Sequence, residues 1–291
     1  MNVPLPTVAV IGLGAMGARL AANLCAGGYP VVVANRSPEP VRDLVAAGAS
    51  AAGSPAEAAS RAEVVLVAVS DDEASAAVWL DRDTGVLAGA HRGTLAVEAS
   101  TLSPRWVRNL AAAAALDGLR FLEAPMIGSR PQAEARALVH LAGGRPEVLA
   151  DARAVLECSA ARVHHVGDHG TAATLKLIVN ASLATQVAVL AELLALARRA
   201  GLDPAESVRF LADLPVTSPA AARAAGVMTA EDFAPNFPVR LVDKDLRYLT
   251  ALAEDLATET PMARAALAGY QRAGAAGHGD ADLTAIAAAY W

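Results

Sequence analysis

The chain has 291 residues, of which 54% are hydrophobic and 19% are charged, and its formal net charge is −6. This length suffices for one large domain or two ordinary ones, with ample apolar material for their cores. The acidic balance and the lack of a basic run argue against nucleic acid or an anionic membrane as a partner. The two cysteines, Cys25 and Cys158, fit a reduced cytoplasmic protein without a disulfide framework. The early first strand leaves no room for a signal peptide.

A glycine motif follows the first predicted strand. Residues Thr7–Ile11 read as a buried strand, and they lead into the run Gly12-Leu13-Gly14-Ala15-Met16-Gly17, after which the chain has helical character. Strand, Gly-x-Gly-x-x-Gly and helix in that order form the dinucleotide-binding fingerprint. Gly12 would permit the tight turn, Gly14 the approach of a pyrophosphate, and Gly17 close packing of the helix on the strand. We therefore expect all six residues of the run to bind a cofactor, with its phosphates at the helix N-terminus.

The second predicted strand, Pro30–Ala34, ends where a dinucleotide fold chooses between NAD and NADP. An acidic residue here would bind the ribose 2′-hydroxyl of NAD, but the chain has Asn35, Arg36 and Ser37. Arg36 can pair with a 2′-phosphate and stack on adenine, while the other two side chains can form hydrogen bonds. The alternative is a solvated arginine in a turn, with Ser37-Pro38 capping the next helix. We expect NADP(H) to be preferred, with NAD(H) as the second choice.

Strand and helix signals alternate as far as residue 167. Further strands are predicted at residues 63–69, 94–97, 120–123, 138–142 and 162–166. This alternation predicts a Rossmann-type, doubly wound parallel sheet of the α/β class. Val69 and Ser70 end a strand at the edge of that sheet where the cofactor would lie, and we expect them to contact it.

After Gly167 the strand signals stop. The range Thr171–Ala200 can form one long helix, and helix starts follow at residues 203–206, 218–219 and 260–261. We predict an NADP-binding Rossmann domain over residues 1–169 and an all-α substrate and dimerisation domain over residues 170–291, joined by the long helix. The segment 177–196 is strongly apolar but contains polar residues, so it indicates a buried helix rather than a membrane span.

The long helix also carries an apolar stripe, at Leu183, Val187, Leu190 and Leu194. This stripe favours burial between two subunits, and we expect a homodimer or a dimer of dimers. The alternative is that the same stripe belongs to the core of one domain.

Three clusters in the second half of the chain can carry chemistry. The first is the loop from Glu123 to Arg130, whose backbone N–H groups can face an anion, although an ordinary strand exit would look the same. The second is the pair Lys176 and Asn180, which project from one helical face, one turn apart. The third is Asp243-Lys244-Asp245, which by itself is typical of a solvated charge cluster.

Lys176 is the candidate acid or base. A lysine in an apolar helix is costly unless it lines a polar cleft, and a partly desolvated lysine can donate or accept a proton. The alternative is a lysine whose stem covers the helix and whose ammonium reaches solvent.

Together these motifs resemble the β-hydroxyacid dehydrogenase family, which includes 3-hydroxyisobutyrate dehydrogenases and glyoxylate and succinic semialdehyde reductases. The matching positions run along nearly the whole chain: the glycine run, Ser100-Thr101, Glu123-Ala124-Pro125 with Gly128, Lys176 with Asn180, and Lys244-Asp245-Leu246. The resemblance implies that Lys176 is the acid/base and that Asn180 holds the substrate. It also implies that Thr101 lies at the cofactor and that Lys244 closes the cofactor site.

The substrate loop departs from the family pattern. The family usually has Ser-Gly-Gly where this chain has Ile127-Gly128-Ser129, so a hydroxyl that would meet the substrate carboxylate is missing. Arg130 is a candidate extra anion contact. The expected substrate is a small 3-hydroxy acid or a short carboxylate-bearing aldehyde or ketone. Its expected binding residues are Ser100, Ile127, Gly128, Ser129, Lys176 and Asn180.

Two other functions are compatible with the same scaffold. Imine reductases resemble the chain in the segment Asn35-Arg36-Ser37, but they typically carry Asp or Tyr where Lys176 stands. A non-catalytic NADPH-sensing protein would not need that lysine. No metal site is expected, because His140, His164, His165 and His169 lack the spacing of metal ligands.

Overall fold

The computed structural model describes residues 4–291. Internal contacts divide the chain into two compact units after Lys176, and this point lies inside the long helix α9 (Thr171–Arg199). The domain boundary expected after residue 169 stays a prediction. Each unit is described by itself below.

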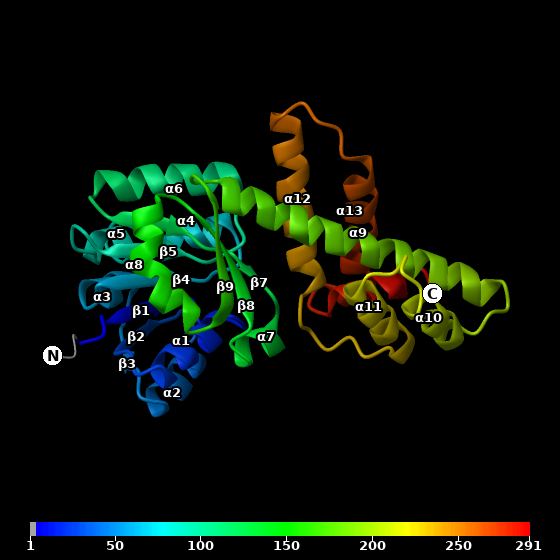
Figure 1. The fold of residues 1–291 in the computed structure, drawn as a ribbon, viewed down its shortest axis with the longest axis horizontal. Coiled ribbons are helices and arrows are strands. Elements are labelled where there is room, and N and C mark those ends of the chain that lie inside the picture. Colours follow the sequence, from blue (N-terminus) through cyan, green and yellow to red (C-terminus); the bar gives the residue numbers. More distant parts are fainter. Residues whose placement is uncertain (1–3) are drawn as a thin grey trace. The chain divides into compact units, whose positions relative to one another are not determined.

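The first unit is built on a nine-stranded sheet (Figure 1). Its strands are β1 (Val8–Ile11), β2 (Val31–Ala34), β3 (Ser50–Ala51), β4 (Val64–Val67), β5 (Leu95–Glu98), β6 (Arg120–Glu123), β7 (Met126–Ile127), β8 (Leu138–Gly143) and β9 (Ala160–Gly167). They lie in the order β3-β2-β1-β4-β5-β6-β8-β7, and β9 pairs with β8. From β3 to β6 every pairing is parallel, which confirms the predicted Rossmann-type sheet.

The far edge of the sheet differs from the prediction of a purely parallel sheet. Strand β8 runs antiparallel to both β6 and β7, and only β9 restores a parallel pairing. Strands β6 and β7 both pair with β8, and only residues 128–137 connect β7 to β8. An antiparallel neighbour can be reached by so short a connection, whereas a parallel return needs a crossover of a dozen or more residues. The two-residue strands β3 and β7 were not expected, because so short a stretch shows no alternation in the sequence.

Helices cover both faces of this sheet. They are α1 (Gly17–Ala26), α2 (Glu39–Ala46), α3 (Pro55–Ser60), α4 (Asp72–Leu80), α5 (Val86–Gly89), α6 (Pro104–Leu116), α7 (Arg130–Glu134) and α8 (Pro146–Glu157). Successive residues of β1 enter different cores: Val8 and Val10 pack with α1 and α8, while Ala9 and Ile11 pack with α3 and α6. In Figure 1, α6 lies along the top of the unit and α1 and α2 lie below the sheet.

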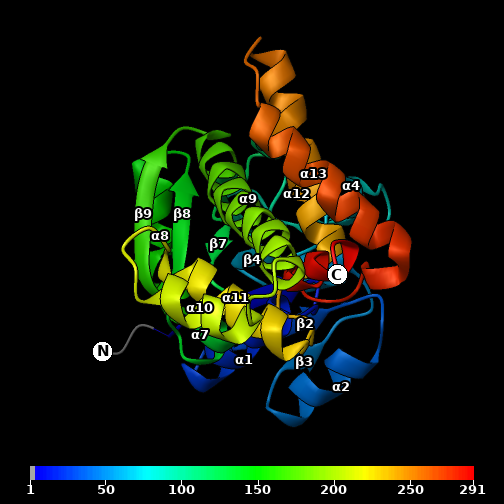
Figure 2. The same ribbon diagram turned by 90° about the vertical axis from the view of Figure 1, so that its right-hand side faces the viewer.

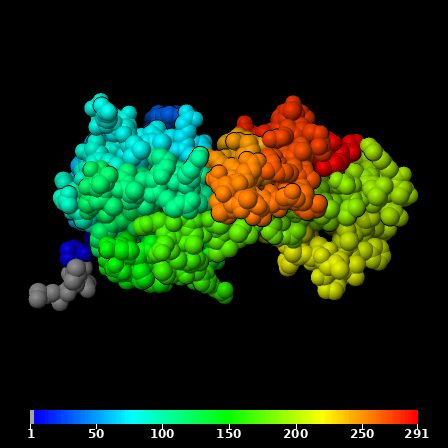
Figure 3. Space-filling model, turned by 90° about the horizontal axis from the view of Figure 1, so that it is seen from above, coloured from blue at the N-terminus to red at the C-terminus, as the bar shows by residue number. Residues whose placement is uncertain are grey.

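The second unit is helical. After α9 come α10 (Pro204–Ala212), α11 (Pro219–Ala230), α12 (Val239–Asp255), α13 (Pro261–Ala273), a π turn (Gly274–His278) and a 3₁₀ helix (Leu283–Ala289). Helices α12 and α13 run side by side (Figure 2). The orange region that they form with their connecting turn lies at the surface of this unit (Figure 3). Tyr270 of α13 is fully buried and donates a hydrogen bond to the carbonyl oxygen of Ala184 at 3.2 Å, which ties α13 to α9.

The apolar stripe of α9 lies in the core of this helical unit. Leu183, Val187, Leu190 and Leu194 all pack in one cluster with residues of α11, α12 and α13. The prediction that this stripe is buried between subunits is therefore wrong, because the neighbouring helices already cover it. A different face of α9 is exposed, with Val189 and Leu193 each 48% accessible and Leu196 62%. By length and composition α9 could cross a membrane, and half of its apolar window is buried inside the structure.

Candidate active site

The glycine loop joins β1 to α1, and among its three glycines Gly14 alone has open space where a side chain would stand. Gly12 has φ +85°, and a Cβ there would lie 2.4 Å from the carbonyl oxygen of Ala68. A Cβ on Gly17 would lie 1.9 Å from the carbonyl oxygen of Gly12, so the helix packs directly on the loop. Nothing lies within 4 Å of the corresponding point on Gly14, and no side chain caps the start of α1. Bare backbone and an uncapped helix start fit a bound pyrophosphate.

Asn35 holds this loop against the end of β2. Its Oδ1 accepts a hydrogen bond from the N–H of Leu13 at 2.9 Å, and its Nδ2 donates to the carbonyl oxygen of Ser37 at 3.0 Å. Asn35 therefore uses its side chain to position backbone on both sides of the expected ribose site. The side chains of Arg36 and Ser37 are exposed, as a contact to a 2′-phosphate would require.

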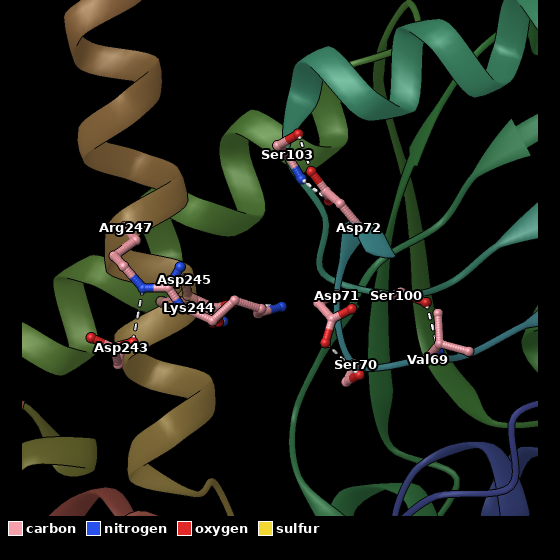
Figure 4. Close-up of polar contacts among 11 residues, drawn as sticks. Val69, Ser70, Asp71, Asp72, Ser100, Ser103, Asp243, Lys244, Asp245 and Arg247 are labelled. Atoms are coloured by element: carbon pink, nitrogen blue, oxygen red, sulfur yellow. Dashed lines mark hydrogen bonds and ion pairs between the residues drawn. The ribbon is translucent and has the colours of Figure 1, made fainter. Parts of the chain in front are cut away.

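The ends of β4 and β5 are joined by a buried polar network, part of which Figure 4 shows. The N–H of Val69 donates to Ser100 Oγ at 2.8 Å. The N–H of Ser100 donates in turn to Glu98 at 2.9 Å, and the side chains of Ser75 and Trp79 donate to the same carboxylate. Burial raises the pKa of Glu98, and these donors oppose that effect. The network brings Val69 and Ser100 together, as expected for two residues at one sheet edge.

A second buried carboxylate, Glu123 at the end of β6, faces the first residues of α9. It accepts hydrogen bonds from the N–H groups of Gly170 at 2.5 Å, Ala172 at 3.1 Å and Ala173 at 3.0 Å. Burial raises the pKa of Glu123 from 4.5 to about 7, although the three N–H donors and Arg108 lower it. The sequence indicates Glu123 only as the first residue of the substrate loop. Its contact with the start of α9 could not be predicted, because the partners lie 47 to 50 residues later in the chain.

The substrate loop uses one of its expected donors internally. Both the N–H and the hydroxyl of Ser129 donate to Gln132 Oε1, at 3.0 and 2.9 Å. The bond from the N–H is one half of a capping box at the start of α7; in the other half the Ser129 side chain accepts from the backbone N–H of Gln132. Ile127 is half-buried in β7, and Gly128 adopts φ +122°. The Nε of Arg130 is buried without a hydrogen-bond partner.

A buried histidine contacts this loop. His140, which pairs with Met126 across β7 and β8, is fully buried, and its Nδ1 contacts the carbonyl oxygen of Ala124 at 2.7 Å. Burial lowers its pKa to about 4. Within residues 4–291 there is no group of three or more His, Cys, Asp or Glu side chains placed to hold a metal ion.

Lys176 and Asn180 lie one turn apart on α9 and are both buried, at 7% exposure. In the helical unit, Asn180 Nδ2 donates to Asp245 Oδ2 at 2.5 Å. The other oxygen of Asp245 forms an ion pair with Lys244 at 3.0 Å, and that ammonium lies 5.2 Å from the centre of the Tyr248 ring. Figure 4 shows Lys244 and Asp245 adjacent on α12.

Asp245 belongs to a motif that the sequence singles out, but the sequence assigns it no role of its own. It joins two motifs that lie 65 residues apart. Asp245 is 3% exposed, and a carboxylate so deeply buried needs partners of this kind.

A methyl group added to a loop glycine would affect folding or cofactor binding, depending on the position. Gly14→Ala should fold normally but weaken NADPH binding by about tenfold or more, because its Cβ enters the space left for the pyrophosphate. Gly17→Ala is the matched control, since its Cβ would meet Gly12 and should lower thermal stability and binding together. Fluorescence titration with NADPH and thermal unfolding measure the two effects. Unchanged NADPH affinity in Gly14→Ala would contradict the assignment.

The raised pKa of Glu123 makes the stability of the fold depend on pH. The folded protein holds this proton more tightly than the unfolded chain, so the stabilisation is complete below pH 4.5 and lost as pH rises through about 7. The unfolding free energy of wild type, measured relative to that of Glu123→Gln, should therefore fall by roughly 2 kcal/mol from about pH 5 to about pH 8. Urea unfolding of both proteins at each pH measures it, and a constant difference would refute the expectation.

Known proteins match the chain in both units. A family model described as the NAD binding domain of 6-phosphogluconate dehydrogenase matches residues 7–167. A second, described as the NAD-binding region of NADP-dependent 3-hydroxyisobutyrate dehydrogenase, matches residues 170–290.

Individual relatives match over most of their own length. An NAD-dependent L-serine dehydrogenase of Pseudomonas aeruginosa is 34% identical over 96% of both chains. A 3-hydroxyisobutyrate dehydrogenase of the same organism is 34% identical over 88% of both. The solved structure of a Mycobacterium tuberculosis 3-hydroxyisobutyrate dehydrogenase with L-serine has a TM-score of 0.88, with 30% identity and 98% coverage of each chain. The chain therefore belongs to the β-hydroxyacid dehydrogenase family of nicotinamide-dependent enzymes that act on hydroxyl groups.

Proposed function

We propose that this enzyme transfers hydride between NADP(H) and a small 3-hydroxy acid or the corresponding carboxylate-bearing aldehyde or ketone. The observation that carries the proposal is the buried Lys176, held on a helix whose start is fixed by Glu123. The nicotinamide, when bound, supplies or accepts the hydride. The chain has to move one proton at the substrate oxygen, and Lys176 is the group proposed to do so.

Lys176 has opposite tasks in the two directions. During reduction its ammonium gives a proton to the oxygen of the carbonyl as hydride reaches the carbon. During oxidation the neutral amine takes the hydroxyl proton as hydride leaves. A lysine taken out of water is easily retuned for such transfer, because burial disfavours its charged form.

Asn180 is proposed to orient the reacting oxygen. An amide nitrogen has two N–H groups, and Asp245 accepts a hydrogen bond from this nitrogen. The second N–H can then donate to the substrate oxygen one helical turn from Lys176. Asp245 fixes the amide orientation, so the donor is aimed before the substrate arrives.

The substrate carboxylate is proposed to meet the backbone of Gly128, the hydroxyl of Ser100 and the guanidinium of Arg130. Ser129 is a weaker candidate than the sequence indicated, because Gln132 already accepts from both of its donors. Serine and 3-hydroxyisobutyrate, which name the relatives' activities, are both 3-hydroxy acids, and this supports the same class here.

Two features support NADP(H) over NAD(H). Arg36 is exposed next to the ribose site, where an acidic residue would otherwise select NAD. The family model that matches the helical unit is described as NADP-dependent, whereas one relative is named as NAD-dependent. The side chain at position 36 is therefore the local determinant that we propose.

A substrate panel tests the proposed reaction class. Initial rates with NADP⁺ or NADPH should be highest for L-serine, 3-hydroxyisobutyrate, or small aldehydes that carry a carboxylate. Turnover of cyclic imines alone would establish an imine reductase instead. NADPH binding without turnover of any compound would indicate a binding protein.

The acid/base assignment predicts a specific defect. Lys176→Ala should lower kcat by about 10²–10⁴ while leaving NADPH affinity unchanged, since it removes proton transfer and no cofactor contact. Lys176→Arg is the matched control: it keeps the positive charge, but a guanidinium holds its proton at neutral pH and should also fail. Steady-state rates and NADPH titration measure both. Near-normal kcat in either variant would overturn the assignment.

The cofactor preference predicts a second effect. Arg36→Asp should weaken NADPH binding by about 10–100-fold relative to NADH, because it removes a charge-assisted pair with the 2′-phosphate. Arg42→Asp, which changes an exposed arginine on α2, should leave the preference unchanged. Parallel titrations with both cofactors give the ratio. An unaltered ratio in Arg36→Asp would remove the 2′-phosphate argument.

We also propose that the enzyme is a cytoplasmic homo-oligomer, a dimer or a dimer of dimers, that buries the exposed face of α9. Val189, Leu193 and Leu196 form an apolar strip that a monomer would leave in water. Light scattering at micromolar concentration should give at least twice the chain mass. The double variant Leu193→Glu/Leu196→Glu should give the monomer mass. Leu116→Glu, which changes an exposed leucine on α6, is the control and should not dissociate the oligomer.

A further inference from the structure

We propose that Glu123 is a positioning residue for hydride transfer: its carboxylate fixes the start of α9, and thereby places Lys176 relative to the loop that follows β6. This inference rests on the proposed role of Lys176. It adds a residue that does not touch the reacting atoms and acts through the helix that carries the acid/base.

The first observation is the convergence of three donors on one side chain. The N–H groups of Gly170, Ala172 and Ala173 lie at the start of α9, where intrahelical acceptors are missing. A carboxylate satisfies all three and also lies at the positive end of the helix dipole. The contact therefore fixes the first turn of α9 in direction and in rotation about its axis.

The second observation is that the carboxylate has no freedom to move. Glu123 is 1% exposed, and a Cβ on Gly143 would lie 2.2 Å from its Oε1. The neighbouring strand β8 therefore packs directly against the side chain. Such a group holds the helix start rigidly, rather than as one of several interchangeable conformers.

The third observation is where Glu123 stands in the chain. It is the last residue of β6, and the substrate loop begins at the next residue. On the other side of the contact, Lys176 follows Ala173 by three residues, less than one helical turn. The Glu123 side chain thus links the first residue of the substrate loop to the helical turn that precedes Lys176. Misplacement of a reacting group by about 1 Å can cost about 10²-fold in rate.

The neighbouring strand shows that this placement is specific to Glu123. Glu98 occupies the position in register with it on β5 and is equally buried. Its donors are Ser75, Trp79 and Ser100, so that carboxylate organises the β4–β5 edge. Glu98 and Glu123 therefore occupy paired positions on neighbouring strands, yet each holds a different part of the site.

Glu123→Gln is the test, because the amide keeps the shape but offers one acceptor oxygen and directs its NH₂ at an N–H donor. We expect kcat to fall by about tenfold or more, with NADPH affinity unchanged. The deuterium isotope effect on kcat, measured with deuterated NADPH, should increase because the chemical step becomes slower. Amide hydrogen exchange at residues 170–173 should accelerate. The melting temperature at pH 8 should change little, because Glu123→Gln also removes a carboxylate whose charged form burial disfavours, and this gain offsets the lost hydrogen bond.

Asp282→Asn is the matched control. Asp282 is also buried and accepts from backbone N–H groups of Asn236, Phe237 and Thr284, but it holds a turn of the helical unit. This variant should melt at lower temperature while keeping kcat, the isotope effect and exchange at residues 170–173. Glu123→Asp retains the charge with shorter reach and should lie between wild type and Glu123→Gln.

The outcomes separate this inference from the proposed function. If Lys176→Ala loses turnover but Glu123→Gln keeps kcat and slow exchange at residues 170–173, Glu123 has no positioning role. If Glu123→Gln loses kcat only in proportion to a loss of melting temperature, its role is structural and the inference is overturned. If Lys176→Ala retains turnover, the proposed function fails, whereas the exchange measurement still reports whether Glu123 holds the helix.

Discussion

A buried carboxylate holds the start of the 29-residue helix α9, and the proposed placement of Lys176 depends on this contact. Helix α9 begins with N–H groups that have no intrahelical partner, and Glu123 supplies an acceptor from the sheet. Without it, the helix would have to satisfy those donors with water and could begin in more than one place. The burial that raises the pKa of Glu123 also protects its hydrogen bonds from solvent.

The glycine loop, where the cofactor is expected to bind, is likewise held in place by a few close contacts. Gly12 and Gly17 allow the loop and α1 to pack without side chains, and Asn35 fastens the loop to the next strand. The only open position is Gly14. A phosphate group approaching there would meet oriented backbone N–H groups that need no rearrangement, which is the condition for strong anion binding at a helix start.

Much of this could be predicted from the sequence, because the signals were local. The strand–glycine–helix order, the alternation up to Gly167 and the long helix after it each depend on neighbouring residues. The rest depended on partners far along the chain. Nothing near Leu190 shows that helices α11, α12 and α13, much later in the chain, cover it. Nothing near Ser129 shows that Gln132 accepts from both of its donors, and no local pattern indicates that β8 runs antiparallel to β6. The bond from Asn180 to Asp245 could not be predicted either, because the two residues lie 65 positions apart.

The sharing of Asp245 between Asn180 and Lys244 has an evolutionary consequence. Because the three side chains share one buried carboxylate, the effect of a substitution at one of them depends on the residues at the other two. A residue at position 180 that cannot donate to Asp245 would leave one oxygen of that carboxylate without its hydrogen bond. A substitution at position 180 on α9 therefore calls for a compensating substitution at position 245 on α12.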